Sequence, residues 1–234
     1  MPPRPCLAAL ILTAALAAAG LAHAADAAHP TVVELYESQG CSSCPPANAN
    51  LMALADRADI LALAFGVTYW DELGWKDTFA QPQFTERQRD YAHAWGRHEV
   101  FTPQVVVNGR KDGVGVDPRE LGALIQAGDR GDGGPSLAIG REAVEIGAAK
   151  APAAGAEVWL VRYDPRVIQV AIQRGENSGK TLPHRNVVRQ LTRLGRWTGA
   201  PARFALPAAD DPHLATAVLV QADGAGPILA AARG

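Results

Sequence analysis

Two cysteines separated by two serines, Cys41 and Cys44, are the residues of this sequence best suited to chemistry. A thiolate is the nucleophile of thiol-disulfide exchange, and a second thiol three residues away can resolve the mixed disulfide that forms. A disulfide between them would stabilise a fold only weakly, because the loop that it closes is very short. The pair therefore indicates a working redox couple rather than a structural crosslink.

The start of the chain predicts an export signal and the removal of the third cysteine. Residues 1–6 carry one cation, Arg4, and residues 7–21 are almost wholly apolar. Ala22-His23-Ala24 has the small-x-small pattern of a signal peptidase site. We expect residues 1–24, with Cys6, to be cleaved after Ala24. The mature chain would be periplasmic or secreted and without a membrane anchor, because the apolar run is too short to span a bilayer.

Composition excludes several classes of partner. The chain has 234 residues, a formal net charge of -2, 48% hydrophobic residues and 20% charged residues. These proportions are ordinary for a globular protein, and no basic excess suggests nucleic acid as a partner. The sequence carries no signal for an oligomeric state.

The dithiol falls between a predicted strand and a predicted helix. Residues 31–36 are rich in β-branched and aromatic side chains, which is typical of a strand, and residues 37–40 form a turn. Pro45 and Pro46 follow the cysteines and suit the first turn of a helix, where amides lack partners. The apolar run at residues 60–67 predicts a second, fully buried strand.

Further elements complete a first domain at residues 30–130. Residues 82–96 have helical spacing, and residues 104–107 and 110–116 flank Asn108-Gly109, a strong hairpin signal. Asp117 is a suitable cap for a helix that ends near Gly128.

A Gly- and Asp-rich linker at residues 128–135 then precedes a change of pattern. Short predicted strands separated by turns fill residues 135–234 and indicate a smaller, β-rich, sandwich-like domain. Residues 186–197 are ambiguous between strand and helix.

This order resembles the thioredoxin superfamily, with a dithiol at the first strand-to-helix turn and a Thr-Pro before the hairpin. The resemblance implies an α/β thioredoxin-like domain in which Pro103 is a cis-proline packed against the dithiol. A closer resemblance, to the exported bacterial family catalogued as domain of unknown function 1223, covers nearly the whole mature chain and rests on these motifs: Glu37-Ser-Gln-Gly-Cys-Ser-Ser-Cys-Pro-Pro46, Tyr69-Trp-Asp71, Gly74-Trp-Lys-Asp77, Tyr91-Ala92, Thr102-Pro-Gln104, Gly175-Glu-Asn177, Asn186-Val-Val-Arg189 and Gly226-Pro-Ile-Leu229. That family is itself functionally uncharacterised, so it implies no substrate.

We expect Cys41 to point outward at the helix start as the nucleophile and Cys44 to resolve the mixed disulfide. The helix dipole and the two serine hydroxyls would stabilise the thiolate. The resemblance gives Glu34 as a buried proton acceptor for Cys44; the alternative is an acid on a partly solvated edge strand.

Residues near the dithiol carry two further expectations. One interpretation is that a substrate groove is lined by Thr102, Tyr69 and Trp70. The other is that the aromatic side chains only pack their loop onto the domain. His98 is close enough in sequence to join the thiolates in a soft metal site, although its spacing matches no standard ligand pattern. We expect no metal and no cofactor. Polar residues of the β-rich part resemble turn and strand groups: Asn177, His184, Asn186 and Arg189.

The sequence therefore predicts an exported thiol-disulfide oxidoreductase whose partners are protein thiols or disulfides of the cell envelope. Two alternatives remain open. A redox-inactive binding module would have a buried Cys41 or a disulfide that resists thiol buffers. A copper-binding protein would lose copper when Cys41 or His98 is replaced.

Overall fold

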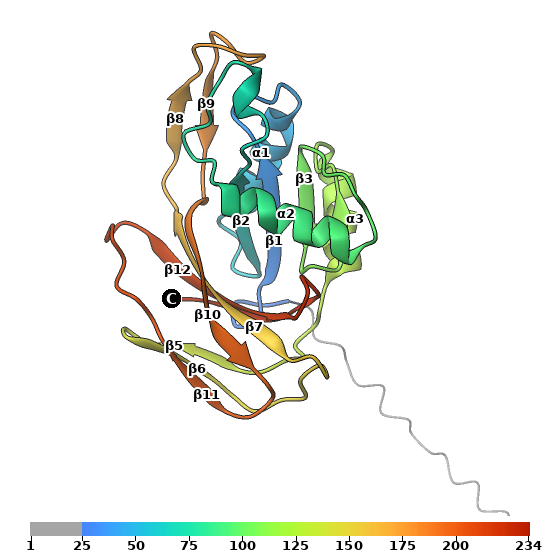
Figure 1. Cartoon of the computed structure of the whole chain (residues 1–234), viewed down its shortest axis with the longest axis vertical. Helices are drawn as coiled ribbons and strands as arrows, with labels where there is room; N and C mark the ends of the chain where they lie inside the picture. Colours follow the sequence, from blue (N-terminus) through green and yellow to red (C-terminus); the bar gives the residue numbers. More distant parts are fainter. Residues whose placement is uncertain (1–24) are drawn as a thin grey trace, which may run out of the picture.

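The computed structural model describes residues 25–234, and the predicted signal, residues 1–24, lies outside them. A mixed eight-stranded sheet in the order β13-β12-β7-β10-β2-β1-β3-β4 forms the centre of the protein (Figure 1). Two small antiparallel sheets accompany it, one with the order β11-β6-β5 and one formed by β8 and β9. The protein is therefore a mixed α/β structure. No helix within residues 25–234 is both long and apolar enough to cross a membrane.

Within residues 25–234, the first part of the chain supplies the helices and the parallel pair β1–β2. Its elements are β1 (Thr31–Glu37), α1 (Cys44–Leu54), β2 (Ile60–Gly66), the 3-10 helix η1 (Asp71–Leu73), α2 (Pro82–Ala94), β3 (Gln104–Val107), β4 (Lys111–Gly113) and α3 (Pro118–Gly128). The predicted hairpin turn is confirmed, since Asn108 and Gly109 both have positive φ. The predicted cap is confirmed too, because the Asp117 carboxylate accepts hydrogen bonds from the amides of Arg119 and Glu120.

The second part of the chain contains only strands. These are β5 (Leu137–Ile139), β6 (Ala143–Ile146), β7 (Ala156–Asp164), β8 (Ile168–Ala171), β9 (Thr181–His184), β10 (Val187–Trp197), β11 (Ala202–Ala205), β12 (Ala215–Ala222) and β13 (Ile228–Arg233). The segment 186–197, ambiguous in sequence, is a long strand.

The large sheet crosses the boundary predicted at residues 130–135. Val187 of β10 pairs in parallel with Ala64 of β2, and the Ala64 amide donates to the carbonyl of Asn186 at 3.0 Å. The Asn186 side chain also donates to the carbonyl of Ala62. Strands of both parts of the chain therefore share one hydrogen-bonded sheet.

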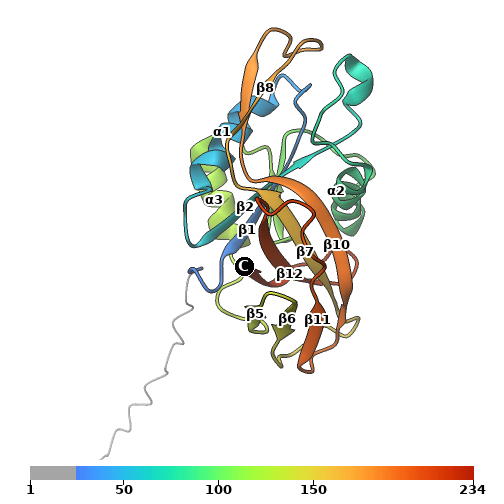
Figure 2. The same ribbon diagram turned by 90° about the vertical axis from the view of Figure 1, so that its left-hand side faces the viewer.

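Helices cover both faces of the sheet around β1 and β2. Val33 and Leu35 pack with α1 and α3 on one face, whereas Val32 and Tyr36 pack with α2 on the other. Figure 2 shows α1 and α3 on the opposite side of the strands from α2. Because side chains alternate along a strand, odd-numbered residues of β1 face α1 and even-numbered residues face α2.

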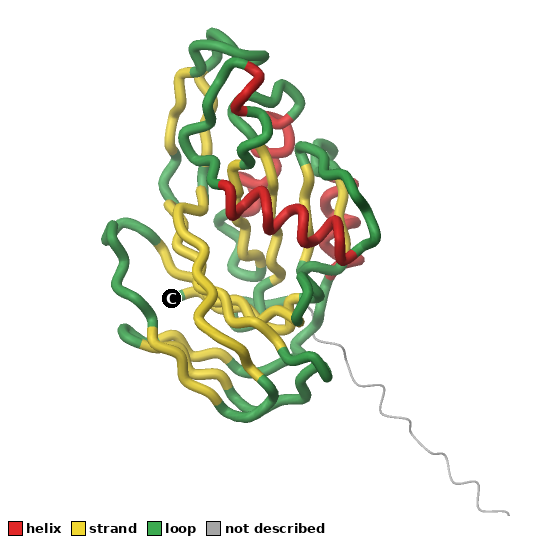
Figure 3. The backbone as a smooth tube through the Cα atoms, viewed as in Figure 1, coloured by secondary structure: helices red, strands yellow, loops and turns green. Residues whose placement is uncertain are grey.

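A third core lies between the small three-stranded sheet and the antiparallel end of the large one. It includes Val144, Leu160, Trp197 and Val218. The β8–β9 hairpin takes no part in that layer. It extends from the large sheet toward the end that carries η1 and the start of α1 (Figure 3).

Candidate functional site

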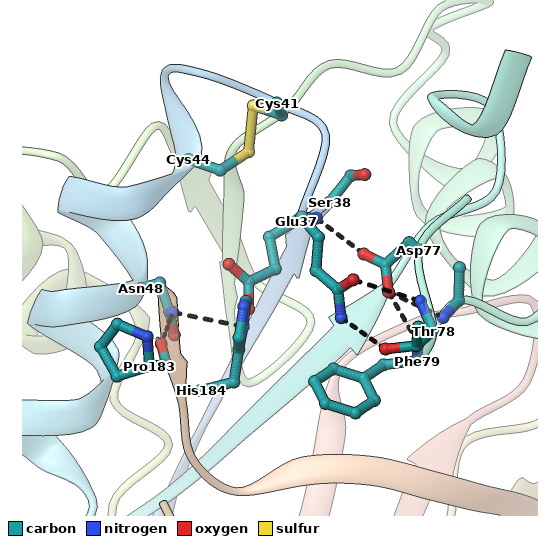
Figure 4. Close-up of polar contacts among 12 residues, drawn as sticks. Glu37, Ser38, Cys41, Cys44, Asn48, Asp77, Thr78, Phe79, Pro183 and His184 are labelled. Atoms are coloured by element: carbon teal, nitrogen blue, oxygen red, sulfur yellow. Dashed lines mark hydrogen bonds and ion pairs between the residues drawn. A yellow bond between two sulfur atoms is a disulfide. The ribbon is translucent and has the colours of Figure 1, made fainter. Parts of the chain in front are cut away.

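Cys41 and Cys44 form a disulfide at the start of α1. Cys41 ends the loop that leaves β1, and Cys44 is the first residue of the helix, with its amide 3.3 Å from the carbonyl oxygen of Cys41. Pro45 and Pro46 occupy the first turn, as the sequence predicts. The strand, dithiol and helix therefore follow one another in the expected order (Figure 4).

Both cysteines are buried, which corrects the expectation that Cys41 points outward. Cys41 is 0% exposed and Cys44 is 1% exposed, whereas Ser42 and Ser43 between them are exposed. The hydroxyl of Ser43 lies 3.3 Å from the sulfur of Cys41. The physical reason for the burial is that segments distant in sequence cover the loop of residues 38–41 from two sides.

The connection between β2 and α2 covers the first side. The indole nitrogen of Trp75 donates to Oε1 of Gln39 at 2.9 Å, and Trp70 lies against Gly40. Trp70 also donates to Oγ1 of Thr102 at 2.7 Å, so it joins the dithiol loop to the segment before β3. The hydroxyl of Tyr69 contacts Gln88 of α2 and also interacts with Thr102. The structure thus brings Trp70 to the dithiol loop, and Thr102 interacts with both Trp70 and Tyr69.

Asp77 fixes the same loop from beneath. Its carboxylate accepts hydrogen bonds from the amides of Gln39 and Phe79, both at 2.7 Å, and from the amide of Ala80 at 3.2 Å. Burial raises the pKa of Asp77 to about 6, against the opposing effect of the amide donors.

The turn of the β8–β9 hairpin covers the second side. Asn177 is fully buried, and its side-chain amide donates to the carbonyl oxygens of Gln39 and Cys41, both at 2.9 Å. The neighbouring Glu176 accepts a hydrogen bond from the amide of Ser42 at 3.0 Å. Hydrogen bonds from Ser42 lower the pKa of Glu176. The dithiol loop therefore rests on residues about 135 positions later in the chain.

A buried acid–base pair lies on the α1 face of the sheet. Oε1 of Glu37, the last residue of β1, is 3.2 Å from Nδ1 of His184, the last residue of β9. Asn48 of α1 approaches the same ring nitrogen at 3.4 Å, and the Phe79 ring packs edge-on against the imidazole. Figure 4 shows Glu37 and His184 beneath the disulfide, with Asn48 one helical turn after Cys44.

The charges around His184 favour its protonated form. Burial acts to lower the pKa of His184, but the Glu37 carboxylate and the charge of Asp77 outweigh it, so the pKa is raised. The Nε2 atom of His184 and the Oδ1 atom of Asn48 are buried without a hydrogen-bond partner.

Glu34 does not lie at this site, which corrects its predicted position. Its carboxylate is fully buried on the α2 face, 2.8 Å from Nε of Arg87 and 2.6 Å from the hydroxyl of Tyr91. The alternation along β1 turns Glu34 away from α1 and the cysteines. The alternative, an acid on a partly solvated edge strand, is also wrong, because β1 pairs with β2 and β3 and is not an edge strand.

Pro103 is buried at the dithiol end of the sheet. The Thr102–Pro103 peptide bond is cis, as the resemblance implies. Because Gln104 pairs with Tyr36, Pro103 lies level with Glu37 at the end of β1. Pro103 therefore lies at the end of the sheet from which the dithiol loop leaves β1.

The histidine considered as a metal ligand does not form a site with the cysteines. His98 is exposed. Across residues 25–234, no three His, Cys, Asp or Glu side chains are grouped so that they could hold a metal ion.

Sequence reasoning missed the contributions of Glu37, Asp77, Asn177 and His184 to this site. All four lie in or close to the motifs that carry the family resemblance, and their positions in those motifs were the signal that could have identified them. Asn177 and His184 are turn and strand residues, as interpreted, but single-sequence patterns do not reveal that the β8–β9 hairpin folds back onto the first strand-to-helix turn.

A family model described as "Protein of unknown function (DUF1223)" matches residues 32–221. The solved structure of protein AGR_C_4864 from Agrobacterium tumefaciens is 33% identical, with a TM-score of 0.72, and the match covers 89% of this chain and 94% of that one. HBP35 of Porphyromonas gingivalis shares the fold alone, at 11% identity and a TM-score of 0.59, over 88% of this chain and 74% of that one. No curated protein matches the chain.

Proposed function

The chain belongs to the DUF1223 family of proteins of unknown function, and we propose that it is an exported thiol-disulfide oxidoreductase that acts on protein thiols or disulfides of the cell envelope. The observation that carries the proposal is the Cys41–Cys44 disulfide between the end of β1 and the first turn of α1. The element order β1-α1-β2-α2-β3-β4-α3 supports a thioredoxin-like arrangement for residues 30–130.

The reaction needs only the two sulfurs and a substrate disulfide or dithiol. In the reducing direction, the Cys41 thiolate attacks one sulfur of a substrate disulfide and releases the other as a thiolate, which takes a proton. Cys44 then loses its proton and attacks the sulfur of Cys41, so the second substrate thiol leaves and the Cys41–Cys44 disulfide forms. The substrate gains two electrons and two protons, and the protein loses them. The opposite direction reverses each step.

The surroundings of Cys41 support its role as the attacking thiolate. It precedes an eleven-residue helix whose first amides point toward the loop, and the positive end of the helix dipole favours an anion there. The Ser43 hydroxyl lies within hydrogen-bonding distance of its sulfur. Both effects lower the free energy of the thiolate relative to the thiol.

Glu37 takes the role of proton acceptor that the sequence assigned to Glu34. It is buried on the face of β1 that α1 covers, and α1 begins with Cys44. Its carboxylate is paired with His184, which supplies a compensating charge inside the protein. A carboxylate held in this way can accept the proton of the Cys44 thiol when the mixed disulfide is resolved.

Thr102, Pro103 and Trp70 form the wall against which a substrate segment would lie. Trp70 is half-buried and is oriented by its hydrogen bond to Thr102. Pro103 has no amide hydrogen, and it lies level with the end of β1. Thr102 and Trp70 are therefore our choice for the contact with a substrate segment, and the buried Pro103 would shape the wall beside them.

The burial of both cysteines favours a second candidate, a redox-inactive binding module. A closed disulfide that no thiol reaches would only fix the shape of the loop that lies between Trp75 and Asn177. The two candidates differ in whether the disulfide exchanges with thiols in the folded protein.

The reduction potential of the Cys41–Cys44 pair tests the proposal. The mature protein, from Ala25, would be equilibrated in glutathione or dithiothreitol buffers and its free thiols counted by alkylation, with Cys41→Ser/Cys44→Ser as the blank. A potential of roughly -270 to -120 mV would support exchange catalysis, because working dithiols lie in that range. A potential below about -300 mV, or no exchange, would support the binding module instead.

A further inference from the structure

The turn of the β8–β9 hairpin holds the dithiol loop through side chains alone. Three contacts connect them: Asn177 to the carbonyls of Gln39 and Cys41, and Glu176 to the amide of Ser42. All three involve backbone groups of the loop, which is the segment that must move when a sulfur–sulfur bond opens.

The hairpin is joined to the rest of the protein at its base, and its turn contacts the dithiol loop through Glu176 and Asn177. Asn186 joins the base to β2, and Arg185 forms a bidentate ion pair with Asp56 after α1. Its strands form a two-stranded sheet of their own. Along the turn, residues 173–176 and 178–180 are exposed, and Asn177 alone is buried.

Asn177 is well suited to hold two carbonyl oxygens at once. Its amide nitrogen carries two hydrogens, and each reaches one carbonyl at 2.9 Å. Its Oδ1 atom accepts from the ammonium of Lys180, which fixes the orientation of the amide. Without Asn177, the carbonyl of Gln39 would lose this donor and that of Cys41 would keep only the amide of Cys44, while the cysteines remain buried, and buried acceptors that lose donors are costly.

We infer that Asn177 is a positioning residue that, with Glu176, latches the dithiol loop in its disulfide-bonded form and so sets how readily that disulfide exchanges. The inference rests on the proposed function. A thiolate must approach the attacked sulfur along the sulfur–sulfur bond, and both sulfurs belong to buried residues. Release of the latch frees the loop for that approach, and closure of the latch favours the oxidised form over the dithiol.

The test compares Asn177→Ala with Ser178→Ala in the mature protein. Ser178 is the adjacent exposed residue of the turn, and its hydroxyl contacts only Gln173 within the hairpin, which makes it a matched control. Two quantities are measured for each variant: the rate of disulfide reduction by dithiothreitol, followed by alkylation of the new thiols, and the equilibrium constant with the same reagent.

We expect Asn177→Ala to be reduced about tenfold faster and to shift the equilibrium about tenfold toward the dithiol, which corresponds to about 30 mV for a two-electron couple. Ser178→Ala should match the wild type in both. A residue that merely stabilised the fold would change the unfolding curve without moving the equilibrium constant. The exposed Glu176→Ala, which removes only the contact to Ser42, gives a second test if Asn177→Ala does not fold, with about threefold effects in the same direction.

If Asn177→Ala is reduced at the wild-type rate and with the wild-type equilibrium constant, the latch is overturned and the proposed function stands. Glu176→Ala decides the same point if Asn177→Ala does not fold. If the wild-type disulfide does not exchange but that of Asn177→Ala does, the latch is supported, because its contacts then prevent exchange in the wild type. Absence of exchange in both would overturn the proposed function and the latch with it.

Discussion

Oε1 of Glu37 and Nδ1 of His184 lie 3.2 Å apart although 147 positions separate the two residues. Each is the last residue of its strand, and both are buried. The pair joins the strand that leads to the dithiol to the hairpin that covers it. Several measurable properties of the protein should depend on this contact.

Replacement of Glu37 by Gln should slow thiol exchange, and it also removes the carboxylate that favours the protonated form of His184. The amide keeps the shape of the side chain but cannot take a proton from Cys44, so the rate near neutral pH should fall about 10²-fold, the lower range for loss of a general base. The rate should recover as pH approaches the pKa of an ordinary thiol, about 8.5. Stopped-flow reduction of a protein disulfide between pH 6 and 9 would measure this, and an unchanged pH profile would exclude Glu37 as the acceptor.

Glu34→Gln provides the contrasting control on the opposite face of β1. The change leaves the buried Arg87 guanidinium without its carboxylate, and an unpaired buried charge costs about 3–5 kcal/mol of unfolding free energy. Urea denaturation would detect that loss. The reduction potential of the dithiol should stay at the wild-type value, and a shift of that potential would restore Glu34 to the site.

The stability of the protein should fall as the pH rises above the ordinary pKa of histidine. The folded-state pKa of His184 is raised, so its protonated form stabilises the fold fully below about pH 6.5, the unfolded value. That contribution disappears as the pH passes through the higher folded pKa. Urea titrations from pH 5.5 to 8.5 should show this decrease, and His184→Gln should show it reduced. Equal slopes in both proteins would contradict the assignment.

The two cysteines should differ when each is replaced alone. Cys44→Ser retains the attacking sulfur of Cys41 and lacks the resolving one, so it should accumulate a mixed disulfide with oxidised glutathione, visible by mass spectrometry of the intact protein. Cys41→Ser should accumulate much less, because the Ser43 hydroxyl lies within hydrogen-bonding distance of the Cys41 sulfur and favours a thiolate there. Preferential labelling of Cys44 would reverse the assigned roles.

If the chain is exported as predicted, its mature N-terminus should be Ala25. Expression of the full chain in a bacterium, followed by fractionation and N-terminal sequencing, should give a periplasmic or secreted protein that begins at Ala25. A cytoplasmic protein that retains Cys6 would contradict the predicted compartment.

Local signals predicted the local structure well, and they failed where a contact depends on topology. The Asn108-Gly109 turn and the Asp117 cap were predictable because a few adjacent residues determine them. The face of Glu34 was not, since β1 is buried on both faces and both sets of alternate residues are largely apolar. The positions of Asn177 and His184 depend on how β10 docks beside β2, which no pattern within either strand encodes.

The docking of β10 on β2 also has a consequence for fragments of this protein. Every residue of β2 is buried, and the strand has partners on both sides only because β10 pairs with it. A fragment that ends at the linker near residue 130 would carry β2 as a bare, apolar edge, ready to recruit strands of other chains. Such a fragment should aggregate. Proteolysis within the second part of the chain should expose the dithiol loop and, at the same time, make the remaining protein less soluble.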